Sequence, residues 1–518
     1  MELKDQQARD VIAHALDKNL MVLAGAGAGK TYALVQRMVN AVQIGVVEVD
    51  RLAAITFTRK AAGEMRGRFF SQLKACVEDV EGEERDRVRR ALEKVDQCFI
   101  GTIHSFCGQL LRERPVEAGL PPDFSEVEDR EEAVMRREAW DRFVQRCFLD
   151  EDPRLAQFEA LGLRTEDLFS FFQRRCQFSD VALRFEKVDK PDLAGAVVQF
   201  EAFLEEAESH LPDPLPGKRD PLQSALTRAR LFLLNRGIQS DADRLTLLQM
   251  MTGRLSVTLK SWAPNQDFAK TLRDELLSEF QAEVLDPVLT QWRQYVYQFA
   301  SAFVDDAVQA YAESRRSSGR LTFQDLLELA ALLLKDHPEV RRYFQDRYRC
   351  LFVDEFQDTD PIQAEMLLYL TGEDLEEVDW RKLKPRSGSL FLVGDGKQSI
   401  YRFRRADVET FRLVRDRIVD TGGDVANLNT SFRSLGRLCD WVNEAFEPLF
   451  AEQDERYQAE FGPLFKFKAD GDDDFAVRKV SIDKVYRNNR GGIVGEDAEC
   501  VANFIAVAIA GETEFNGA

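Results

Sequence analysis

One stretch of the sequence decides the fold, Ala24-Gly-Ala-Gly-Ala-Gly-Lys-Thr31, and it directly follows the apolar run Leu20-Met-Val-Leu23. Small residues between a strand and a helix let successive backbone N–H groups turn inward around phosphate oxygens, while a lysine neutralises their charge. The strict pattern starts with glycine, and Ala24 holds that position here, so the match is to the relaxed form. A glycine-rich turn without a ligand would explain the glycines but not Gly29-Lys30-Thr31. The stretch therefore predicts a phosphate-binding loop made of Ala24, Gly25, Ala26, Gly27, Ala28, Gly29, Lys30 and Thr31.

A second segment, Cys350-Leu-Phe-Val-Asp-Glu-Phe-Gln-Asp-Thr359, places an acidic pair behind four apolar residues. Continuous apolarity is typical of a strand that is buried on both faces of a parallel sheet. At its end Asp354 can hold Mg²⁺ together with Thr31, while Glu355 orients an attacking water. Taken alone, such a pair is usually a solvated strand end. Beside a phosphate loop, it predicts a nucleoside triphosphatase site that binds ATP and Mg²⁺.

Five short apolar runs, separated by helical patterns, predict a doubly wound α/β domain with its ligand at the carboxyl ends of the strands. They are Leu20–Leu23, Leu52–Thr56, Phe99–Gly101, Cys350–Val353 and Leu390–Val393. Between about Leu110 and Arg320 the pattern changes to long, charged, amphipathic stretches. These stretches predict a mostly helical insertion, in which no residue carries a functional signal of its own.

The composition agrees with a large enzyme, and its length indicates more than one domain, because 518 residues exceed the size at which single cores stop growing. Eight cysteines lie scattered without a C-x-x-C pair, and the four histidines show no metal-ligand spacing. No apolar run approaches about 18 residues, so we expect a cytoplasmic protein without a membrane segment or a zinc site. A net charge of −20 would ordinarily count against nucleic acid as a ligand. For nucleic-acid binding the local electrostatic field matters more than the net charge, and basic residues gather in two of the motifs described next.

Four further segments extend the pattern beyond a generic ATPase. In chain order they are Ile55-Thr-Phe-Thr-Arg-Lys-Ala-Ala-Gly-Glu-Met65, Gly101-Thr-Ile-His-Ser-Phe106, Gly394-Asp-Gly-Lys-Gln-Ser-Ile-Tyr-Arg-Phe-Arg404 and Asn429-Thr-Ser-Phe-Arg-Ser434. Together with the phosphate loop and the acidic strand end, this series resembles the UvrD/Rep-like superfamily 1 DNA helicases. Within that family, Thr102-Ile-His-Ser-Phe-Cys107 looks most similar to the AddA/RecB branch. The resemblance runs from Leu3 to about Val442.

The resemblance implies a RecA-like P-loop NTPase with a parallel sheet, a large helical insertion and an incomplete second RecA-like domain. It assigns residues 1–109 and 321–425 to the first RecA-like domain, 110–320 to the insertion and 426–518 to the start of the second domain. It also implies an ATP-dependent 3′-to-5′ DNA translocase and helicase in recombinational repair or defence. Such an enzyme would act on single-stranded or partly duplex DNA, and its partner would be an AddB-like or RecC-like subunit.

At the nucleotide, the resemblance implies that Gln7 reads the adenine edge and that Phe432 stacks on the base. Tyr32 stands where many relatives place an arginine on the other face, so it can stack but supplies no charge. Gln398 and Arg433 match groups that contact the γ-phosphate and therefore sense whether ATP or ADP is bound. The implied catalytic residues are Glu355, Lys30, Gln398 and Arg433.

Basic residues interleave with aromatic ones in two of the motifs, around Lys60 and around Arg404. Stacked aromatic rings with nearby cations are how proteins line a channel for single-stranded DNA. By spacing alone, the aromatics would be core residues and the arginines a solvated face. The resemblance favours DNA contact, and it makes His104 a DNA-contacting histidine rather than a base or a metal ligand. The implied DNA-binding residues are Phe57, Thr58, Lys60, His104, Tyr401, Phe403 and Arg404.

Two later motifs of the family do not follow Arg433, one around Thr-x-His-x-x-Lys-Gly-Leu-Glu and one with an arginine finger in Ala-x-Thr-Arg-Ala. Ala225-Leu-Thr-Arg-Ala229 mimics the second but precedes the acidic strand end, so we interpret it as a decoy. An arginine finger contributes about 10³–10⁵ in rate. We therefore expect the N-terminal part of a longer or split helicase, able to bind ATP and DNA but poor at turnover alone.

Three function classes stay open at this point. The first is the ATP-driven helicase, which DNA-stimulated ATP hydrolysis would indicate. The second is a module that binds ATP and single-stranded DNA without unwinding and needs a partner chain or the missing part, which tight DNA binding without turnover would indicate. The third is a truncated, largely inert product, which aggregation would indicate.

Overall fold

The computed structural model describes residues 3–183, 186–212, 220–450, 461–468 and 490–510. The chain divides into two compact units, of which unit 1 contains Met1–Pro122 and Asp325–Ala518 and unit 2 contains Asp123–Gln324. The finer division into residues 1–109, 110–320, 321–425 and 426–518 stays a prediction. Within the described ranges, no helix is long and apolar enough to cross a membrane.

Unit 1 is built on a six-stranded sheet in the order β3-β2-β6-β7-β1-β8, and all neighbouring strands in it are parallel. The strands are β1 (Leu20–Ala24), β2 (Leu52–Thr56), β3 (Phe99–Thr102), β6 (Cys350–Val353), β7 (Leu390–Gly394) and β8 (Asp424–Leu428). The first five coincide with the five predicted strands to within one residue. The predicted RecA-like α/β fold is therefore confirmed, and β8 adds an edge strand beside β1.

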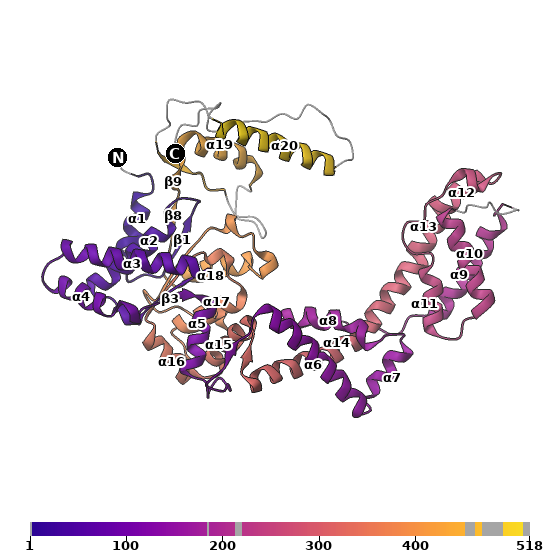
Figure 1. Ribbon diagram of the computed structural model, residues 1–518, viewed down its shortest axis with the longest axis horizontal. Coiled ribbons are helices and arrows are strands. Elements are labelled where there is room, and N and C mark those ends of the chain that lie inside the picture. The colour runs from indigo at the N-terminus through magenta and orange to yellow at the C-terminus, as the bar shows by residue number, and fades with distance from the viewer. Residues whose placement is uncertain (1–2, 184–185, 213–219, 451–460, 469–489, 511–518) are drawn as a thin grey trace. The chain divides into compact units, whose positions relative to one another are not determined.

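Helices cover the sheet because parallel strands need crossover connections (Figure 1). Alternate strand residues such as Val22 and Phe352 share one core with Leu34 and Phe69 from the helices that follow β1 and β2. Successive strand residues point to opposite faces, so the other residues of each strand line the second face. The helices of unit 1 up to β8 are α1 (Gln6–His14), α2 (Lys30–Ile44), α3 (Arg59–Asp79), α4 (Gly82–Glu93), α5 (Ile103–Glu113), α15 (Phe323–Asp336), α16 (Pro338–Arg347), α17 (Pro361–Thr371) and α18 (Val408–Asp420).

Beyond β8 the chain continues into a small parallel pair of strands. β9 (Thr430–Leu435) pairs with β10 (Phe465–Lys468), and α19 (Gly436–Phe446) lies between them in sequence. A last helix, α20, spans Arg490–Ile509. The predicted boundary at residue 426 falls inside β8, whose register with β1 belongs to the first sheet. Parts of the predicted second domain, 426–518, lie outside the described residues, so that assignment stays a prediction.

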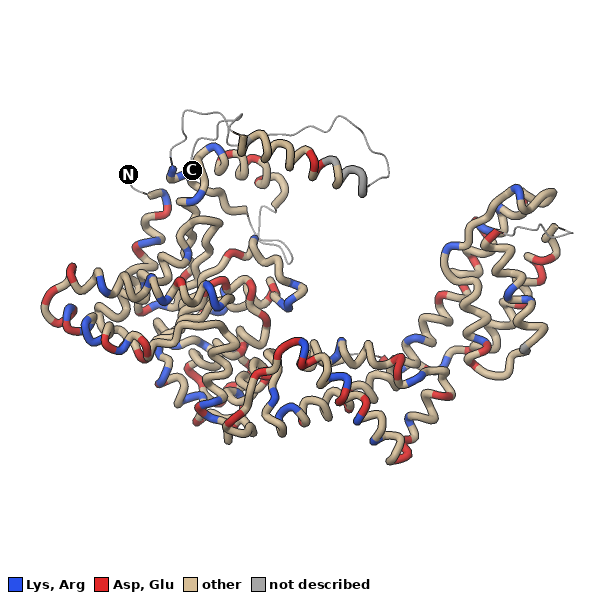
Figure 2. Tube along the Cα trace, viewed as in Figure 1, with Lys and Arg blue, Asp and Glu red and all other residues tan. Residues whose placement is uncertain are grey.

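Unit 2 is helical in its described part, apart from the short parallel pair β4 (Ser125–Glu126) and β5 (Arg320–Leu321). Two separate apolar clusters hold it together, and the long helix α14 (Asp286–Ser318) contributes to both. Lys and Arg residues are interspersed with Asp and Glu residues along these helices, a pattern that is typical of solvated helices (Figure 2). The predicted mostly helical insertion is confirmed. Its other helices are α6 (Asp129–Leu149), α7 (Pro153–Ala160), α8 (Thr165–Gln177), α9 (Leu193–Ser209), α10 (Pro221–Arg236), α11 (Asp241–Gln249), α12 (Gln266–Thr271) and α13 (Leu277–Phe280).

Candidate active site

The phosphate-binding loop joins β1 to α2, whose first residue is Lys30. Gly27 and Gly29 have φ angles of +75° and +85°, a left-handed conformation that glycine adopts without steric cost. A Cβ atom on Gly27 would also lie only 2.6 Å from Cβ of Arg433. The loop therefore brings the chain to the N-terminus of α2, where free N–H groups and the helix dipole attract anions.

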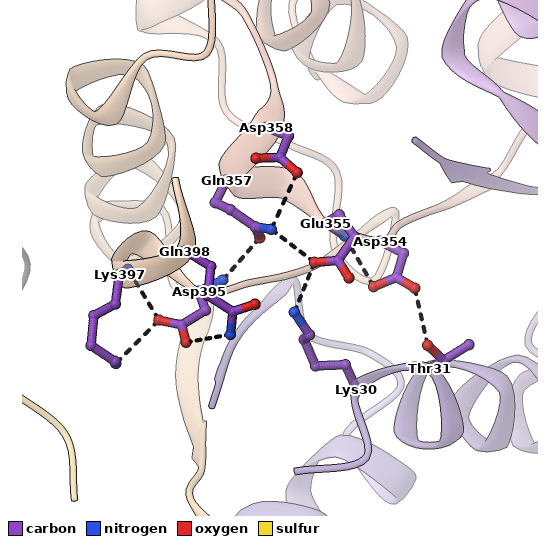
Figure 3. Close-up of polar contacts among 9 residues, drawn as sticks. All are labelled: Lys30, Thr31, Asp354, Glu355, Gln357, Asp358, Asp395, Lys397 and Gln398. Atoms are coloured by element: carbon purple, nitrogen blue, oxygen red, sulfur yellow. Dashed lines mark hydrogen bonds and ion pairs between the residues drawn. The ribbon is translucent and has the colours of Figure 1, made fainter. Parts of the chain in front are cut away.

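Two carboxylates at the end of β6 meet the first residues of α2 (Figure 3). Lys30 Nζ lies 2.7 Å from Glu355 Oε2, and Thr31 Oγ1 donates a hydrogen bond to Asp354 Oδ2 at 3.2 Å. Glu355 has a φ angle of +54°, an uncommon conformation for a residue with a side chain and one that clusters at functional turns. The structure thus brings the predicted metal ligands and the predicted base to one end of the sheet.

The electrostatics of this end of the sheet favour a bound cation. Burial raises the pKa of Asp354 to about 6, and the adjacent charge of Glu355 adds to this effect while Lys30 opposes it. Burial and the same Glu355 charge raise the pKa of Asp358 to about 6. The carboxyl groups of Asp354, Glu355 and Asp358 therefore lie near one lysine, Lys30, and a divalent cation would reduce the repulsion between them.

The oxygen atoms of Thr31 and Asp354 are ligands of the kind that Mg²⁺ prefers. Mg²⁺ usually takes only one or two protein ligands and completes its shell with phosphate oxygens and water. In the described part of the chain, no group of three or more His, Cys, Asp or Glu residues could hold a metal ion. The two residues therefore fit a magnesium ion that arrives with a nucleotide.

A chain of hydrogen bonds links Glu355 to the end of β7 (Figure 3). Gln357 donates through Nε2 to Glu355 Oε2 at 2.8 Å, and its Oε1 accepts from the backbone N–H of Asp395 at 3.0 Å. Asp395 in turn accepts from Gln398 Nε2 at 2.9 Å and pairs with Lys397 Nζ at 3.1 Å. The predicted γ-phosphate residue Gln398 is thereby linked to the predicted base through two intervening residues, Gln357 and Asp395.

Strand β9 crosses directly against the phosphate loop. The backbone N–H of Phe432 donates to the carbonyl of Gly27 at 2.9 Å, and Ser431 Oγ donates to the carbonyl of Ala26 at 3.4 Å. The Phe432 ring lies 3.8 Å from the position that a Cβ atom on Gly29 would take. Phe432 and Arg433, which the family resemblance assigned to the nucleotide, are thus both in contact with the loop.

The other two predicted adenine residues have exposed side chains. Gln7 is exposed on α1, and Tyr32 on α2 is 58% exposed. Their roles at the base stay predictions.

The sequence interpretation missed Asp5 and Arg9. Arg9 contacts the phosphate loop, and Asp5 contacts the start of β9. Arg9 forms a bidentate pair with Asp5 at 3.0 and 2.9 Å. The carboxylate of Asp5 also accepts the backbone N–H groups of Asn429 and Thr430 at 3.1 and 2.9 Å. The Asp-x-x-x-Arg spacing predicts a pair on one helix face, but nothing local in the sequence predicts contacts with residues more than 400 positions away.

Aromatic side chains from two motifs stack beside each other. The rings of Phe57 and Tyr401 are stacked with centroids 5.5 Å apart, and Tyr401 contacts Phe403 edge to face at 5.7 Å. The guanidinium of Arg404 lies 5.5 Å from the Tyr401 ring centroid. Phe403 is 77% exposed, so it is not a core residue. The structure thus brings four of the predicted DNA-binding residues into one cluster, which we name the aromatic cluster.

Other predicted DNA residues lie on neighbouring helix starts. Thr58 caps α3 by accepting the N–H of Ala61 at 3.1 Å, Lys60 is exposed, and His104 is partly exposed on α5. Arg405, which directly follows Arg404, has a φ angle of +72°. That left-handed conformation costs a residue with a side chain about 1–2 kcal/mol.

A parallel sheet that holds a phosphate loop beside an Asp-Glu strand end defines a P-loop nucleotide-binding protein of the RecA-like class. The chain belongs to the UvrD/REP helicase family, because the UvrD/REP helicase N-terminal domain matches residues 4–418. The predicted resemblance to this family and its AddA branch is therefore confirmed.

Curated relatives carry names from that branch. The A subunit of the ATP-dependent helicase/nuclease of Syntrophomonas wolfei is 29% identical over 490 residues, which covers 85% of this chain and 38% of that protein. The protein of the same name from Streptococcus sanguinis is 27% identical, with 84% and 38% covered. The exonuclease/helicase protein RexA of Lactococcus lactis is 26% identical, with 87% and 41% covered. The chain thus spans about two fifths of the length of these relatives.

Proposed function

We propose that this chain binds and hydrolyses ATP with Mg²⁺ and couples hydrolysis to 3′-to-5′ movement along single-stranded or partly duplex DNA. It would act as a helicase of the AddA type in recombinational repair or defence, in the cytoplasm and with an AddB-like or RecC-like subunit. The observation that carries the proposal is the convergence of Lys30, Thr31, Asp354 and Glu355 at the carboxyl end of one parallel sheet. Family membership and the names of the relatives support the DNA-directed part.

The proposed roles follow from atoms already in contact. Lys30 exchanges Glu355 for phosphate oxygens, which leaves the carboxylate of Glu355 able to accept a proton from an attacking water. Thr31 and Asp354 hold Mg²⁺, which supplies charge neutralisation at the phosphates when it is bound. Gln398, in the turn that follows β7, and Arg433, within β9, would contact the γ-phosphate.

Coupling to DNA is proposed to run along the hydrogen-bonded chain from Glu355 through Gln357 to Asp395. Six residues after Asp395 comes Tyr401, whose ring joins the aromatic cluster. Phe57, Asp354 and Glu355 also line one small cavity, so the aromatic cluster and the hydrolytic end of the sheet adjoin at the end of β2. A change in the contacts of Glu355 therefore has two short physical routes to the rings that would stack on bases.

The test is steady-state ATP hydrolysis by the purified chain at low salt, with and without single-stranded DNA. The proposal predicts DNA-stimulated turnover, and it predicts that Glu355→Gln keeps nucleotide binding but loses about 10²–10⁴-fold in rate. Glu93→Gln, an exposed change at the end of α4, is the matched control and should turn over normally. Unchanged turnover in Glu355→Gln would refute the base assignment. Tight ATP and DNA binding without any turnover would favour the binding module over the helicase.

A further inference from the structure

The side chain of Arg9 contacts the predicted base-stacking ring, that of Phe432. Its guanidinium lies over the Phe432 ring at 4.9 Å from the centroid, within the range of a cation–π contact. Arg9 Nη2 also donates to the carbonyl of Ala28 in the phosphate loop at 3.1 Å. A single side chain on α1 therefore contacts both the loop and the ring on β9.

Asp5 makes the position of Arg9 rigid. The pair is bidentate, and the side chains of Arg9 and Asp5 are only 15% and 4% exposed. Burial alone would raise the pKa of Asp5, but the hydrogen bonds from Arg9 and from the backbone of Thr430 outweigh it and hold the pKa below its ordinary value. The carboxylate is thus ionised at neutral pH and fixes the planar guanidinium, while its other bonds fix the start of β9.

The residue at position 32 bears on the contact between Arg9 and Phe432. Tyr32, in the first turn of α2, is 58% exposed and carries no charge, so α2 supplies no cation there. Arg9 on α1 supplies a cation instead. Its guanidinium contacts the Phe432 ring, which is predicted to stack on the base. The ring of Phe467 also lies close to the Phe432 ring, with centroids 4.8 Å apart and planes tilted by 55°, and it carries no charge.

We propose that Arg9 is a positioning residue that holds the Phe432 ring as a platform for the base of the nucleotide. Arg9 thereby sets the part of the affinity that depends on the base, while Lys30 and the loop set the part that depends on the phosphates. The inference rests on the proposed ATP site and deepens it.

The test compares Mg²⁺-ATP with Mg²⁺-tripolyphosphate, which lacks the base, by calorimetric titration of the chain. A stacked base contributes about 5- to 150-fold in affinity, so the wild-type chain should bind ATP tighter than tripolyphosphate by a factor in that range. Arg9→Met should lower this ratio at least about fivefold and change tripolyphosphate affinity less than about twofold. Arg90→Met, an exposed change on α4, is the matched control and should leave the ratio unchanged.

Arg9→Met leaves the buried Asp5 unpaired, so Arg9→Lys and Phe432→Leu provide readouts in which the charge balance is kept. Arg9→Lys keeps a cation but loses the bidentate fork, and it should lower the ratio partly. In the Phe432→Leu background, Arg9→Lys should have no further effect on the ratio, because the ring through which it acts is gone.

The outcomes separate this inference from the proposed function. Normal tripolyphosphate binding with the same ATP-to-tripolyphosphate ratio in wild type, Arg9→Lys and Arg9→Met would overturn the role of Arg9 alone. Equal affinity of the wild-type chain for the two ligands would also overturn it. Failure of the folded wild-type chain to bind either ligand would overturn the proposed ATP site together with the inference.

Discussion

Gly27→Ala tests whether the phosphate loop must be held against β9 in its observed conformation. Gly27 has a φ angle of +75°, and alanine needs about 1–2 kcal/mol to adopt it. The new Cβ would lie 2.6 Å from Cβ of Arg433, whereas carbon atoms pack at about 3.5–4.0 Å. The loop and β9 must therefore separate by about 1 Å, which also strains the 2.9 Å hydrogen bond from Phe432 to Gly27.

These terms predict two measurable effects. The backbone cost alone should lower the melting temperature by about 2–8 °C, at about 2–4 °C per kcal/mol for a domain of this size. Separation of β9 from the loop moves Arg433 away from the proposed γ-phosphate position, so ATP affinity should fall by about tenfold or more. Thermal melts followed by circular dichroism and calorimetric titration with Mg²⁺-ATP measure the two quantities independently.

Gly25→Ala is the matched control within the same loop. Gly25 does not have a positive φ angle, and its added Cβ would come close, at 2.9 Å, to the end of the Leu464 side chain, which can rotate away, and would lie at an ordinary 3.9 Å from the Leu428 carbonyl oxygen. This variant should melt close to wild type and bind ATP normally. If Gly27→Ala instead behaves like Gly25→Ala in both assays, the loop is not constrained by β9 and the close contact between them has no energetic consequence.

Three further predictions concern the buried carboxylates and the aromatic cluster. Asp5→Ala removes the partner of Arg9 and of two backbone N–H groups, so the free energy of unfolding in urea should fall by about 3–5 kcal/mol. Because the pKa of Asp354 is raised to about 6, a proton must leave before Mg²⁺ binds below that pH. Mg²⁺-dependent ATP affinity should therefore be level above about pH 7 and fall about fivefold from pH 6 to pH 5. Phe403→Ala removes an exposed ring and should weaken single-stranded DNA binding by about 5- to 150-fold in fluorescence anisotropy.

Each of these predictions has a contradicting result, and the two substitutions also have matched controls. Asp10→Ala on the exposed side of α1 should change stability by less than about 0.5 kcal/mol, and an equally small effect of Asp5→Ala would contradict the buried pair. A pH-independent Mg²⁺ requirement between pH 5 and pH 7 would contradict the environment of Asp354. Phe70→Ala on α3 should leave DNA affinity unchanged, and equal losses in both phenylalanine variants would argue against stacking at Phe403.

The sequence predicted the central strands because parallel strands buried on both faces are continuously apolar. β8 escaped prediction because its sequence, Asp424-Val-Ala-Asn-Leu428, mixes polar with apolar residues, as suits a strand at the edge of the sheet. Its place beside β1 depends on a register that only the folded chain defines.

The sequence also identified the residues that meet around Lys30, because their types and order follow from phosphate and metal chemistry. Asp5 and Arg9 could not be found in this way. Their spacing resembles any pair on a helix surface, and their partners on β9 approach only through the tertiary fold. Local patterns thus identify chemistry, whereas contacts between distant segments decide which ordinary residues support it.

Every role proposed for this chain depends on a Mg²⁺-ATP site around Lys30. Calorimetric titration of the folded chain with Mg²⁺-ATP, compared with Lys30→Ala and with the exposed control Lys18→Ala, tests for that site. We expect saturable binding at one site in wild type and Lys18→Ala, and loss of about a hundredfold or more in Lys30→Ala, because a buried charge pair with phosphate is removed. Equal ATP affinity in all three proteins, or no binding to the folded wild-type chain, would contradict the site.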